Sequence, residues 1–330
     1  MTKDALCAIL REQYALHPRE CERAALGVGS QTWFADCAEG RMVVKFPDAD
    51  AISHPEQEAA LCEHLLAQGI PASRFVRSCD GTVLCVGADG RKFHVQRFET
   101  GRSYAYHTAP EWLLDASAAM LGRIHQALRD YPELPVGIGA DFFRYMTPDS
   151  ARSSYERSLF MARKQGDAIL AAELEYRIAL MQRMPPFSMD LTRLSCLNTH
   201  GDYCINQLIC GEGRINAVID WTAACVHPAV WEIIRSYVYA APECAAGRID
   251  PVGLRRYVDV YMACAPLTAE DQTAMMPLFF YQLAVCDYYG QYYASQASNR
   301  DIFLHQARFS TALLRHMEAC GETLTHALVK

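Results

Sequence analysis

Two aspartates follow apolar segments in the middle of the chain, in a pattern that suits phosphoryl transfer. Asp202 ends the triplet His-Gly-Asp, and Asp220 follows the apolar residues 217–219. The segment between them reads as a hairpin with its turn at 211–213, which would bring the two carboxylates to neighbouring strand ends. In phosphoryl transfer one carboxylate orients and deprotonates the acceptor hydroxyl, while another holds magnesium on the phosphates.

The two motifs, HGDYCINQLI at 200–209 and AVIDW at 217–221, resemble the aminoglycoside phosphotransferase/choline kinase superfamily of small-molecule kinases. The signature of that family is HGD, an Asn five residues later, and an Asp at an apolar strand end. The resemblance implies that Asp202 is the catalytic base, that Asp220 binds Mg²⁺ and that ATP is the phosphate donor. It also implies a bilobal, protein-kinase-like fold of the α+β class.

The sequence departs from the family signature at the amide that helps to bind the metal. Gln207 stands where the family has Asn, and Asn206 lies one position earlier. Because side chains alternate between the faces of a strand, a slip of one residue would point Asn206 away from the metal. We therefore favour Gln207 as the second metal ligand, with Asn206 as the alternative.

The first half of the chain supplies parts that match a nucleotide site. Gly27, Gly29 and Ser30 lie between two predicted strands, as a loop that covers phosphates would. Lys45 ends the next strand and resembles the family lysine that neutralises the phosphates. Glu58, in the helix that follows, resembles the glutamate that pairs with this lysine.

A hinge strand and a helix end extend the resemblance. Residues 93–101 resemble the family hinge, where the backbone between Gln96 and Phe98, with Arg97 between them, would bind the adenine edge. His125 lies at the end of a helix that resembles the family pattern "LG.LH", and we expect a structural role for it. A structural role is also expected for Glu232, with Arg235 one turn away as its partner.

The elements that must position these residues change in type near residue 100. Before it, strands are predicted at 21–27, 32–37, 41–46, 75–78, 82–87 and 92–98, with helices at the N-terminus and at 55–68. After it, helices are predicted at 109–130, 151–183, 229–241, 251–263, 267–296 and 300–319. We therefore expect a nucleotide-binding lobe at 1–99, built on an antiparallel sheet. A mostly helical catalytic and substrate-binding lobe would follow at 100–330, with the hairpin inside it.

The acceptor site of the family lies between the HGD loop and the C-terminal helices. Here the predicted helix 267–296 carries Asp287, Tyr288 and further tyrosines, which could form a pocket for an amine through carboxylate and cation–π contacts. Trp221, beside the metal aspartate, is a third candidate. Helical spacing also favours plain core packing for part of this aromatic stripe.

Composition limits the remaining possibilities. A net charge of −7 argues against a nucleic-acid partner. No apolar stretch is long enough to span a membrane, and 14 cysteines without a CxxC pair favour a reduced, cytoplasmic protein. The partner expected is a small-molecule acceptor, and the oligomeric state is open.

Two functions fit this pattern. The first is an ATP-dependent kinase that phosphorylates a hydroxyl of a small molecule, such as an amine-bearing metabolite or an aminoglycoside-like compound. The alternative is a catalytically weak, nucleotide-binding pseudokinase or interaction module of the same fold, which only Gln207 favours. A protein kinase fits less well, because the chain lacks the Asp-Phe-Gly and Ala-Pro-Glu motifs that bracket an activation segment.

Overall fold

The structure is a computed structural model that describes residues 2–24, 30–47, 55–87, 89–295 and 297–329. The chain divides into two compact units. The first combines Met1–Ser103 with Asn206–Ala224, and the second combines Tyr104–Ile205 with Cys225–Lys330. The hairpin between the two aspartates thus groups with the N-terminal part of the chain, while the lobe boundary at 99/100 stays a prediction.

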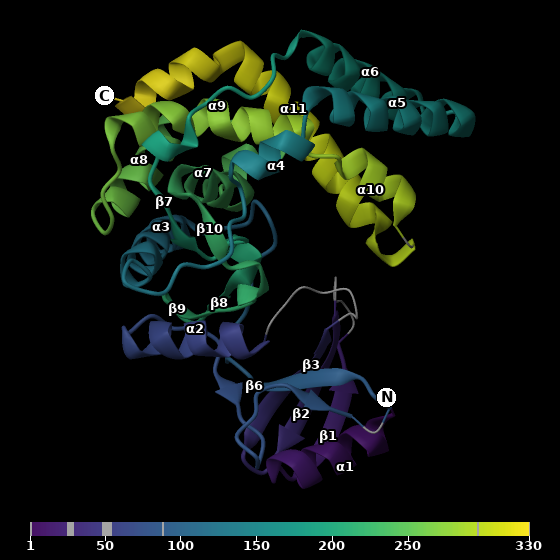
Figure 1. Cartoon of the computed structure of the whole chain (residues 1–330), viewed down its shortest axis with the longest axis vertical. Helices are drawn as coiled ribbons and strands as arrows, with labels where there is room; N and C mark the ends of the chain where they lie inside the picture. Colours follow the sequence, from purple (N-terminus) through teal and green to yellow (C-terminus); the bar gives the residue numbers. More distant parts are fainter. Residues whose placement is uncertain (1, 25–29, 48–54, 88, 296, 330) are drawn as a thin grey trace. The chain divides into compact units, whose positions relative to one another are not determined.

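An antiparallel sheet forms the body of the first unit, with α1 (Lys3–Tyr14) packed against it (Figure 1). Its strands run in the order β1 (Pro18–Arg23), β2 (Ser30–Cys37), β3 (Gly40–Pro47), β6 (Lys92–Arg97) and β4 (Phe75–Val76), and β5 (Cys85–Val86) also pairs with β6. The side chains of α1 that the sequence places on one stripe are buried against the sheet: Leu6, Ile9, Leu10 and Tyr14. Thr2 caps this helix by accepting the N–H of Ala5.

The second helix of the first unit, α2 (Pro55–Ala67), begins and ends where the sequence predicts. Pro55 opens it, and Gly69 ends it with a left-handed φ of 72°. Its buried stripe is apolar except for one carboxylate, that of Glu58. The helix therefore carries this carboxylate into the interior of the first unit.

The predicted hairpin is present as β8 (Leu208–Cys210) and β9 (Ile215–Val218), which pair in an antiparallel register. The chain leaves β6 and approaches this hairpin at Gly101, which has a φ of 147°. A Cβ at that position would lie 2.5 Å from the carbonyl oxygen of Cys210, so only glycine fits there. Arg102 then exchanges two backbone hydrogen bonds with Cys210, which fixes the hairpin to the first unit.

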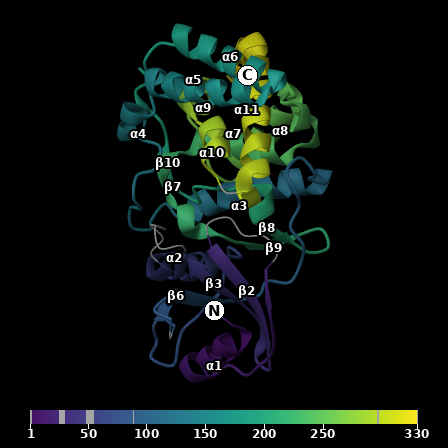
Figure 2. The ribbon, with the colours of Figure 1, turned by 90° about the vertical axis from the view of Figure 1, so that its right-hand side faces the viewer.

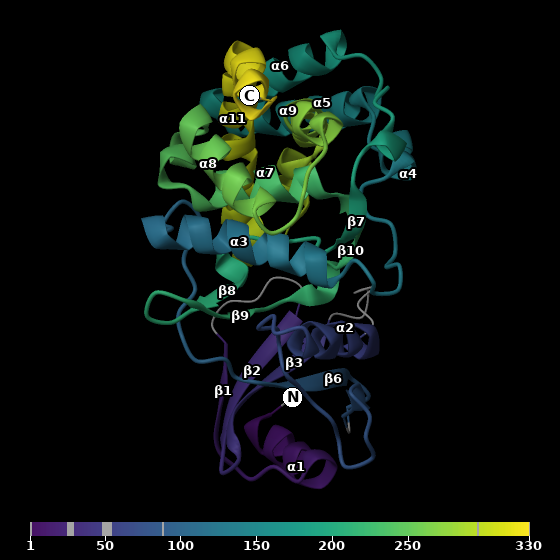
Figure 3. The same cartoon turned by 90° about the vertical axis from the view of Figure 1, so that its left-hand side faces the viewer.

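The second unit is mostly helical. Its elements are α3 (Glu111–Ala127), α4 (Ala140–Tyr145), α5 (Pro148–Gln165), α6 (Ala168–Arg183), β7 (Cys196–Thr199), β10 (Cys225–Pro228), α7 (Ala229–Ala240), α8 (Pro251–Met262), α9 (Ala269–Val285), α10 (Tyr288–Ala294) and α11 (Ala297–Val329). The long α11 packs on α8 and α9 (Figure 2). Helix α3 lies beside α8 and the short β7–β10 ladder (Figure 3).

Two long helices predicted from the sequence are each divided in the structure. The segment 151–183 breaks at Gly166, which caps α5 with a left-handed φ of 72°. The segment 267–296 breaks at Cys286, and Asp287 caps the new helix α10. The α+β fold class is confirmed, and no described helix is long and apolar enough to cross a membrane.

Candidate active site

Glu232 on α7 holds the loop that carries Asp202. Its fully buried carboxylate accepts the backbone N–H groups of His200 and Tyr203, both at 3.3 Å. It also contacts Nε2 of His125 at 3.0 Å. Burial alone would raise the pKa of Glu232, but the hydrogen bond from His125 and the nearby imidazole of His227 hold it at about 2. Glu232 is therefore ionised, and it fixes the backbone on both sides of Gly201-Asp202.

Asp202 forms an ion pair with Arg235, a contact that differs from the partner predicted for Arg235. Nη2 of Arg235 donates to Oδ1 of Asp202 at 2.5 Å, and Nη1 lies 2.8 Å from Sγ of Cys204. The prediction that Arg235 pairs with Glu232 is therefore wrong: the carboxylate of Glu232 is occupied by His125 and by backbone N–H groups of the loop, and the guanidinium of Arg235 contacts Asp202. Burial raises the pKa of Cys204 to about 12, so it is a thiol and not a reactive thiolate.

Asp220 lies in the first unit, directly after β9. Its backbone has a φ of 67°, in the left-handed region that residues other than glycine seldom adopt. Nζ of Lys45 lies 3.5 Å from Oδ1 of Asp220, and Oγ1 of Thr222 donates to the same oxygen at 3.3 Å. The fold thus brings together a lysine and an aspartate that the sequence assigns to the phosphates and the metal.

Glu58 is near these groups but makes no ion pair with Lys45 among the described residues. Its side chain is buried, and neither carboxylate oxygen has a hydrogen bond of good geometry in the described part of the chain. Burial raises its pKa to about 7, although the charge of Lys45 acts in the opposite direction. The predicted Lys45–Glu58 pair is thus absent here, and Lys45 contacts Asp220 in its place.

The two candidate amides stand at the start of the hairpin in a 3₁₀ turn, Ile205–Gln207, and not in a strand. The alternation of strand faces, on which the preference for Gln207 depends, therefore does not apply to this pair. Backbone pairing sets Gln207 beside Ile219, the residue before Asp220, because the carbonyl of Gln207 accepts the N–H of Ile219 at 2.9 Å. Oδ1 of Asn206 is buried and has no hydrogen-bond partner among the described residues.

A magnesium ion would suit these donors. Mg²⁺ prefers oxygen ligands and is commonly held by one or two carboxylates together with substrate phosphates. Asp220 supplies a carboxylate that is 40% exposed, and Gln207 and Asn206 carry amide oxygens on the segment that leads into the paired strand β8. The unpaired oxygen of Asn206 makes this amide a stronger candidate than the sequence alone indicates.

The other predicted nucleotide contacts that the structure describes lie along the sheet. Gly27 and Gly29 fall outside the described residues, and Ser30 is the first residue of β2. At the hinge, Arg97 N–H donates to the carbonyl of Arg74 and Phe98 N–H to that of Arg41. Gln96 is inside β6, paired on both sides. The backbone donors of Arg97 and Phe98 are therefore already used by the sheet.

Two of the three candidate acceptor residues have structural partners. Trp221 is 1% exposed and its indole N–H donates to the carbonyl of Val218 at 2.9 Å. Asp287 caps α10 by accepting the N–H of Gly290, and it also accepts the hydroxyl of Ser154. Tyr288 is half-buried, and neighbouring Cys286 and burial raise its pKa well above the usual range. Trp221 and Asp287 thus serve packing and capping in this structure.

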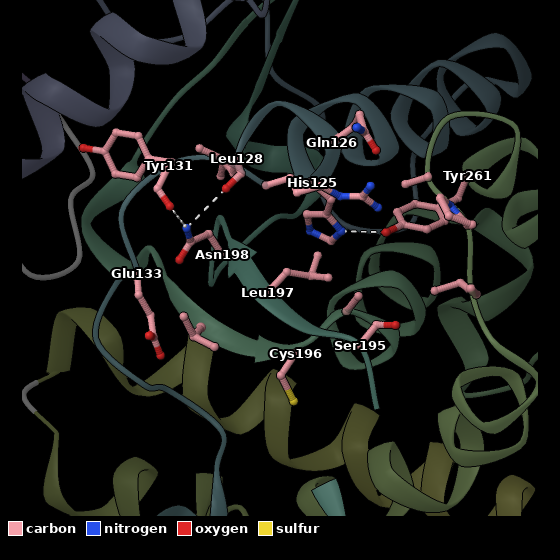
Figure 4. A pocket seen from close by; sticks show the side chains of 16 residues that line it. His125, Gln126, Leu128, Tyr131, Glu133, Ser195, Cys196, Leu197, Asn198 and Tyr261 are labelled. Atoms are coloured by element: carbon pink, nitrogen blue, oxygen red, sulfur yellow. Dashed lines mark hydrogen bonds between the residues drawn. The ribbon is translucent and has the colours of Figure 1, made fainter. Parts of the chain in front are cut away.

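A cavity of about 310 Å³ lies elsewhere in the second unit (Figure 4). His125 is in its wall, and Nδ1 of this ring contacts the hydroxyl of Tyr261 at 2.7 Å. The side-chain amide of Asn198 donates to backbone carbonyls, and Ser195 donates to Asp271. These polar groups hold the fold together, and the contacts of His125 are structural.

Sequence reasoning missed Arg235 as a neighbour of Asp202. Its guanidinium lies over the rings of Trp231 and Tyr239, at 5.6 and 5.3 Å from their centroids. One signal was present: Arg235 stands among apolar and aromatic residues of a helix that follows the Asp220 motif, and a charge in such a setting calls for a charged partner. Because Glu232 lies on the same helix, the sequence alone did not show that the partner is Asp202.

The chain belongs to the phosphotransferase enzyme family, which it matches over residues 20–267. Solved structures share the fold. A spectinomycin phosphotransferase in complex with ADP and spectinomycin is 14% identical, with 99% of each chain covered and a TM-score of 0.64. The choline kinase from Cryptosporidium parvum Iowa II is 12% identical, with 99% of this chain and 98% of that chain covered and a TM-score of 0.61.

An aminoglycoside 2'-phosphotransferase in complex with GDP is 14% identical, with 94% and 99% covered and a TM-score of 0.61. None of the curated proteins shows significant sequence similarity to the chain. The resemblance to the aminoglycoside phosphotransferase/choline kinase superfamily is thereby confirmed, and with it a kinase-like phosphotransfer function.

Proposed function

We propose that the protein transfers the γ-phosphate of ATP to a hydroxyl group of a small molecule. Family membership supports a phosphotransferase, and related folds bind nucleotides in solved structures with ADP or AMP-PNP. One observation carries the proposal for this chain. Lys45 and Asp220, far apart in the sequence, lie 3.5 Å apart in the first unit, where a lysine and a metal-binding aspartate would meet the phosphates.

Asp202 would act as the catalytic base. It accepts a hydrogen bond from the acceptor hydroxyl and takes the proton as the bond from that oxygen to the γ-phosphorus forms. The bond to the bridging oxygen of ADP breaks at the same time. The transition state is loose and proton transfer is late, so an aspartate of ordinary basicity is sufficient. Its carboxylate is 43% exposed, so a substrate can reach it.

Asp220 would hold Mg²⁺ together with Gln207 or Asn206, and Lys45 would bind the phosphates. When bound, the ion neutralises charge on the phosphates. The structure gives the chain's own contribution: Asp220 is held in a left-handed conformation at the end of β9, with Lys45 and Thr222 on Oδ1. Bound phosphates would attract the ammonium group of Lys45 away from Asp220, because they carry more negative charge than one carboxylate.

The adenine edge would bind just past β6. The N–H groups of Arg97 and Phe98 are used inside the sheet, so the segment Glu99–Gly101 is the next backbone able to supply contacts. Arg74 holds Glu99 with two hydrogen bonds of 2.8 Å, which fixes the direction of this segment. The hinge contact is therefore proposed two or three residues later than the sequence predicts.

Calorimetry with a non-hydrolysable ATP analogue in millimolar Mg²⁺ tests nucleotide binding. Lys45→Ala should weaken the affinity at least about tenfold, which is the loss of one charge-assisted phosphate contact. Lys92→Ala, an exposed lysine on β6, is the matched control and should leave the affinity unchanged. Absence of nucleotide binding by the wild-type protein would refute both the kinase and the pseudokinase alternative.

A further inference from the structure

We propose that Arg235 selects an acceptor with an anionic group, such as a carboxylate, next to the hydroxyl that is phosphorylated. The proposal rests on the proposed function and on the assignment of Asp202 as the base. The sequence predicts an amine-bearing acceptor, which would be cationic, and the proposal reverses the sign of that charge. The groups that lie beside Asp202 in the second unit are the reason for this reversal.

The aromatic faces beside the base are already occupied by a cation of the chain. The guanidinium of Arg235 lies over Trp231 and Tyr239 while it donates to Asp202. Such faces could otherwise bind an amine or a quaternary ammonium group through cation–π contacts. A cationic acceptor at this point would meet a guanidinium that stays charged at any physiological pH.

The carboxylate predicted to bind an amine is also engaged. One oxygen of Asp287 accepts the N–H of Gly290 at the start of α10, and the other accepts the hydroxyl of Ser154. An amine would have to break these contacts before it could pair with Asp287. In the second unit a cation therefore lies beside the base, and the carboxylate of Asp287 already accepts hydrogen bonds from other parts of the fold.

Arg235 keeps donor capacity for an anion. A guanidinium has five N–H donors in a planar fork that matches carboxylates and phosphates. Its hydrogen bonds within the described chain go to Cys204 and Asp202. Its side chain is 16% exposed, on a helix that is otherwise buried from Trp231 to Ala240. One fork can therefore bind Asp202 and an anionic acceptor group side by side, with the acceptor hydroxyl close to the base.

Three small diols of similar size and different charge test this assignment. Glycerate, 1,2-propanediol and 3-amino-1,2-propanediol share two adjacent hydroxyls and carry a negative, no and a positive charge. Their dissociation constants are measured by ligand-observed NMR in the presence of Mg²⁺ and a non-hydrolysable ATP analogue. Glycerate should bind at least about tenfold more tightly than the neutral diol, and the amine should bind most weakly.

Arg235→Gln should remove this ranking, since the amide keeps polarity but loses the charge and the fork. Arg256→Gln is the matched control: Arg256 also pairs with an aspartate, Asp115, but on the surface of α8 and α3, so glycerate should keep its advantage. If Arg235→Gln does not fold, as judged by circular dichroism, Arg235→Lys replaces it. That variant keeps the charge without the fork and should lose part of the preference.

Equal binding of the three diols, tightest binding of the amine, or a glycerate preference that is undiminished in a folded Arg235 variant would overturn the proposal. Transfer of labelled phosphate from ATP, measured with wild type and Asp202→Asn, separates this failure from failure of the proposed function. Transfer that depends on Asp202 but favours the amine refutes the anion site alone. Selective glycerate binding without any nucleotide binding or transfer refutes the kinase function and leaves the anion site standing.

Discussion

The candidate site groups of the first unit are loosely paired, whereas those of the second unit are tightly paired. In the first unit Lys45 and Asp220 are 3.5 Å apart, and the buried carboxylate of Glu58 lacks a hydrogen bond of good geometry among the described residues. In the second unit Arg235 contacts Asp202 at 2.5 Å, and Glu232 has three hydrogen-bond donors. The candidate site groups of the two units therefore differ in how fully their charges are paired.

This difference matches the proposed division of labour. Groups that bind a metal ion and phosphates must be able to exchange partners. Charged side chains that are not fully paired can do so. A catalytic base needs a fixed loop, because its misplacement by about 1 Å can lower the rate about 10²-fold. The second unit provides this through Glu232, which anchors the backbone on both sides of Asp202.

The largest effect is expected for Asp202→Asn in the tightly paired half. The substitution keeps the shape but removes the charge and the basic site, so kcat should fall by about 10²–10⁴-fold. Nucleotide affinity should stay within about twofold of wild type. Turnover of labelled ATP with an active acceptor, together with calorimetry, measures both. Near-normal turnover would mean that Asp202 is not the base.

Glu232→Ala should destabilise the protein by at least about 3 kcal/mol. It leaves the N–H groups of His200 and Tyr203 and the ring of His125 buried without their acceptor, each at a cost of about 1–3 kcal/mol. Urea unfolding measures the change. Glu270→Ala, which removes an exposed glutamate paired with Arg193, should change stability by no more than about 0.5 kcal/mol. Equal effects would contradict the anchoring role.

The pH dependence of stability probes the loosely paired half through Glu58. Burial raises its pKa from 4.5 to about 7 in the folded protein, so its stabilising contribution is present below pH 4.5 and is lost as pH rises through 7. The shift corresponds to about 3 kcal/mol. Glu58→Gln should remove this slope in metal-free urea unfolding, whereas Glu56→Gln, an exposed neighbour, should retain it. An identical slope in both variants would show that Glu58 is not the titrating group.

The smallest effect is expected from the two amides. Removal of the amide that binds Mg²⁺ should raise the Mg²⁺ concentration for half-maximal nucleotide binding about tenfold, a loss of about 1.4 kcal/mol. The unpaired oxygen of Asn206 now favours Asn206→Ala over Gln207→Ala as the variant that shows it. An effect of Gln207→Ala alone would restore the preference drawn from the sequence.

Local patterns were enough to predict the elements that carry the site. The stripe on α1, the bounds of α2 and the hairpin 208–218 follow from periodicity, a proline start and glycine turns. The motif carboxylates were identified because HGDYCINQLI and AVIDW resemble the family signature in order and spacing. These features depend on residues close together in the sequence.

Partner choice could not be predicted in the same way. Arg235 pairs with Asp202 and Lys45 with Asp220 because the fold brings their elements together, over separations that no local pattern records. The argument for Gln207 over Asn206 lost its basis for another reason: residues 205–207 form a 3₁₀ turn, where the alternation of strand faces does not hold. Long-range contacts and turn geometry therefore limited the prediction of the site.

The central claim is that Asp220 serves the metal and Asp202 serves the acceptor. A Mg²⁺ titration of nucleotide binding, carried out by calorimetry on Asp220→Asn and Asp202→Asn in parallel, tests it most directly. Asp220→Asn should raise the Mg²⁺ concentration for half-maximal binding by at least about tenfold, since it replaces a charged oxygen ligand with a neutral one. Asp202→Asn should follow the wild-type curve. Equal shifts in the two variants, or a shift only in Asp202→Asn, would contradict the account.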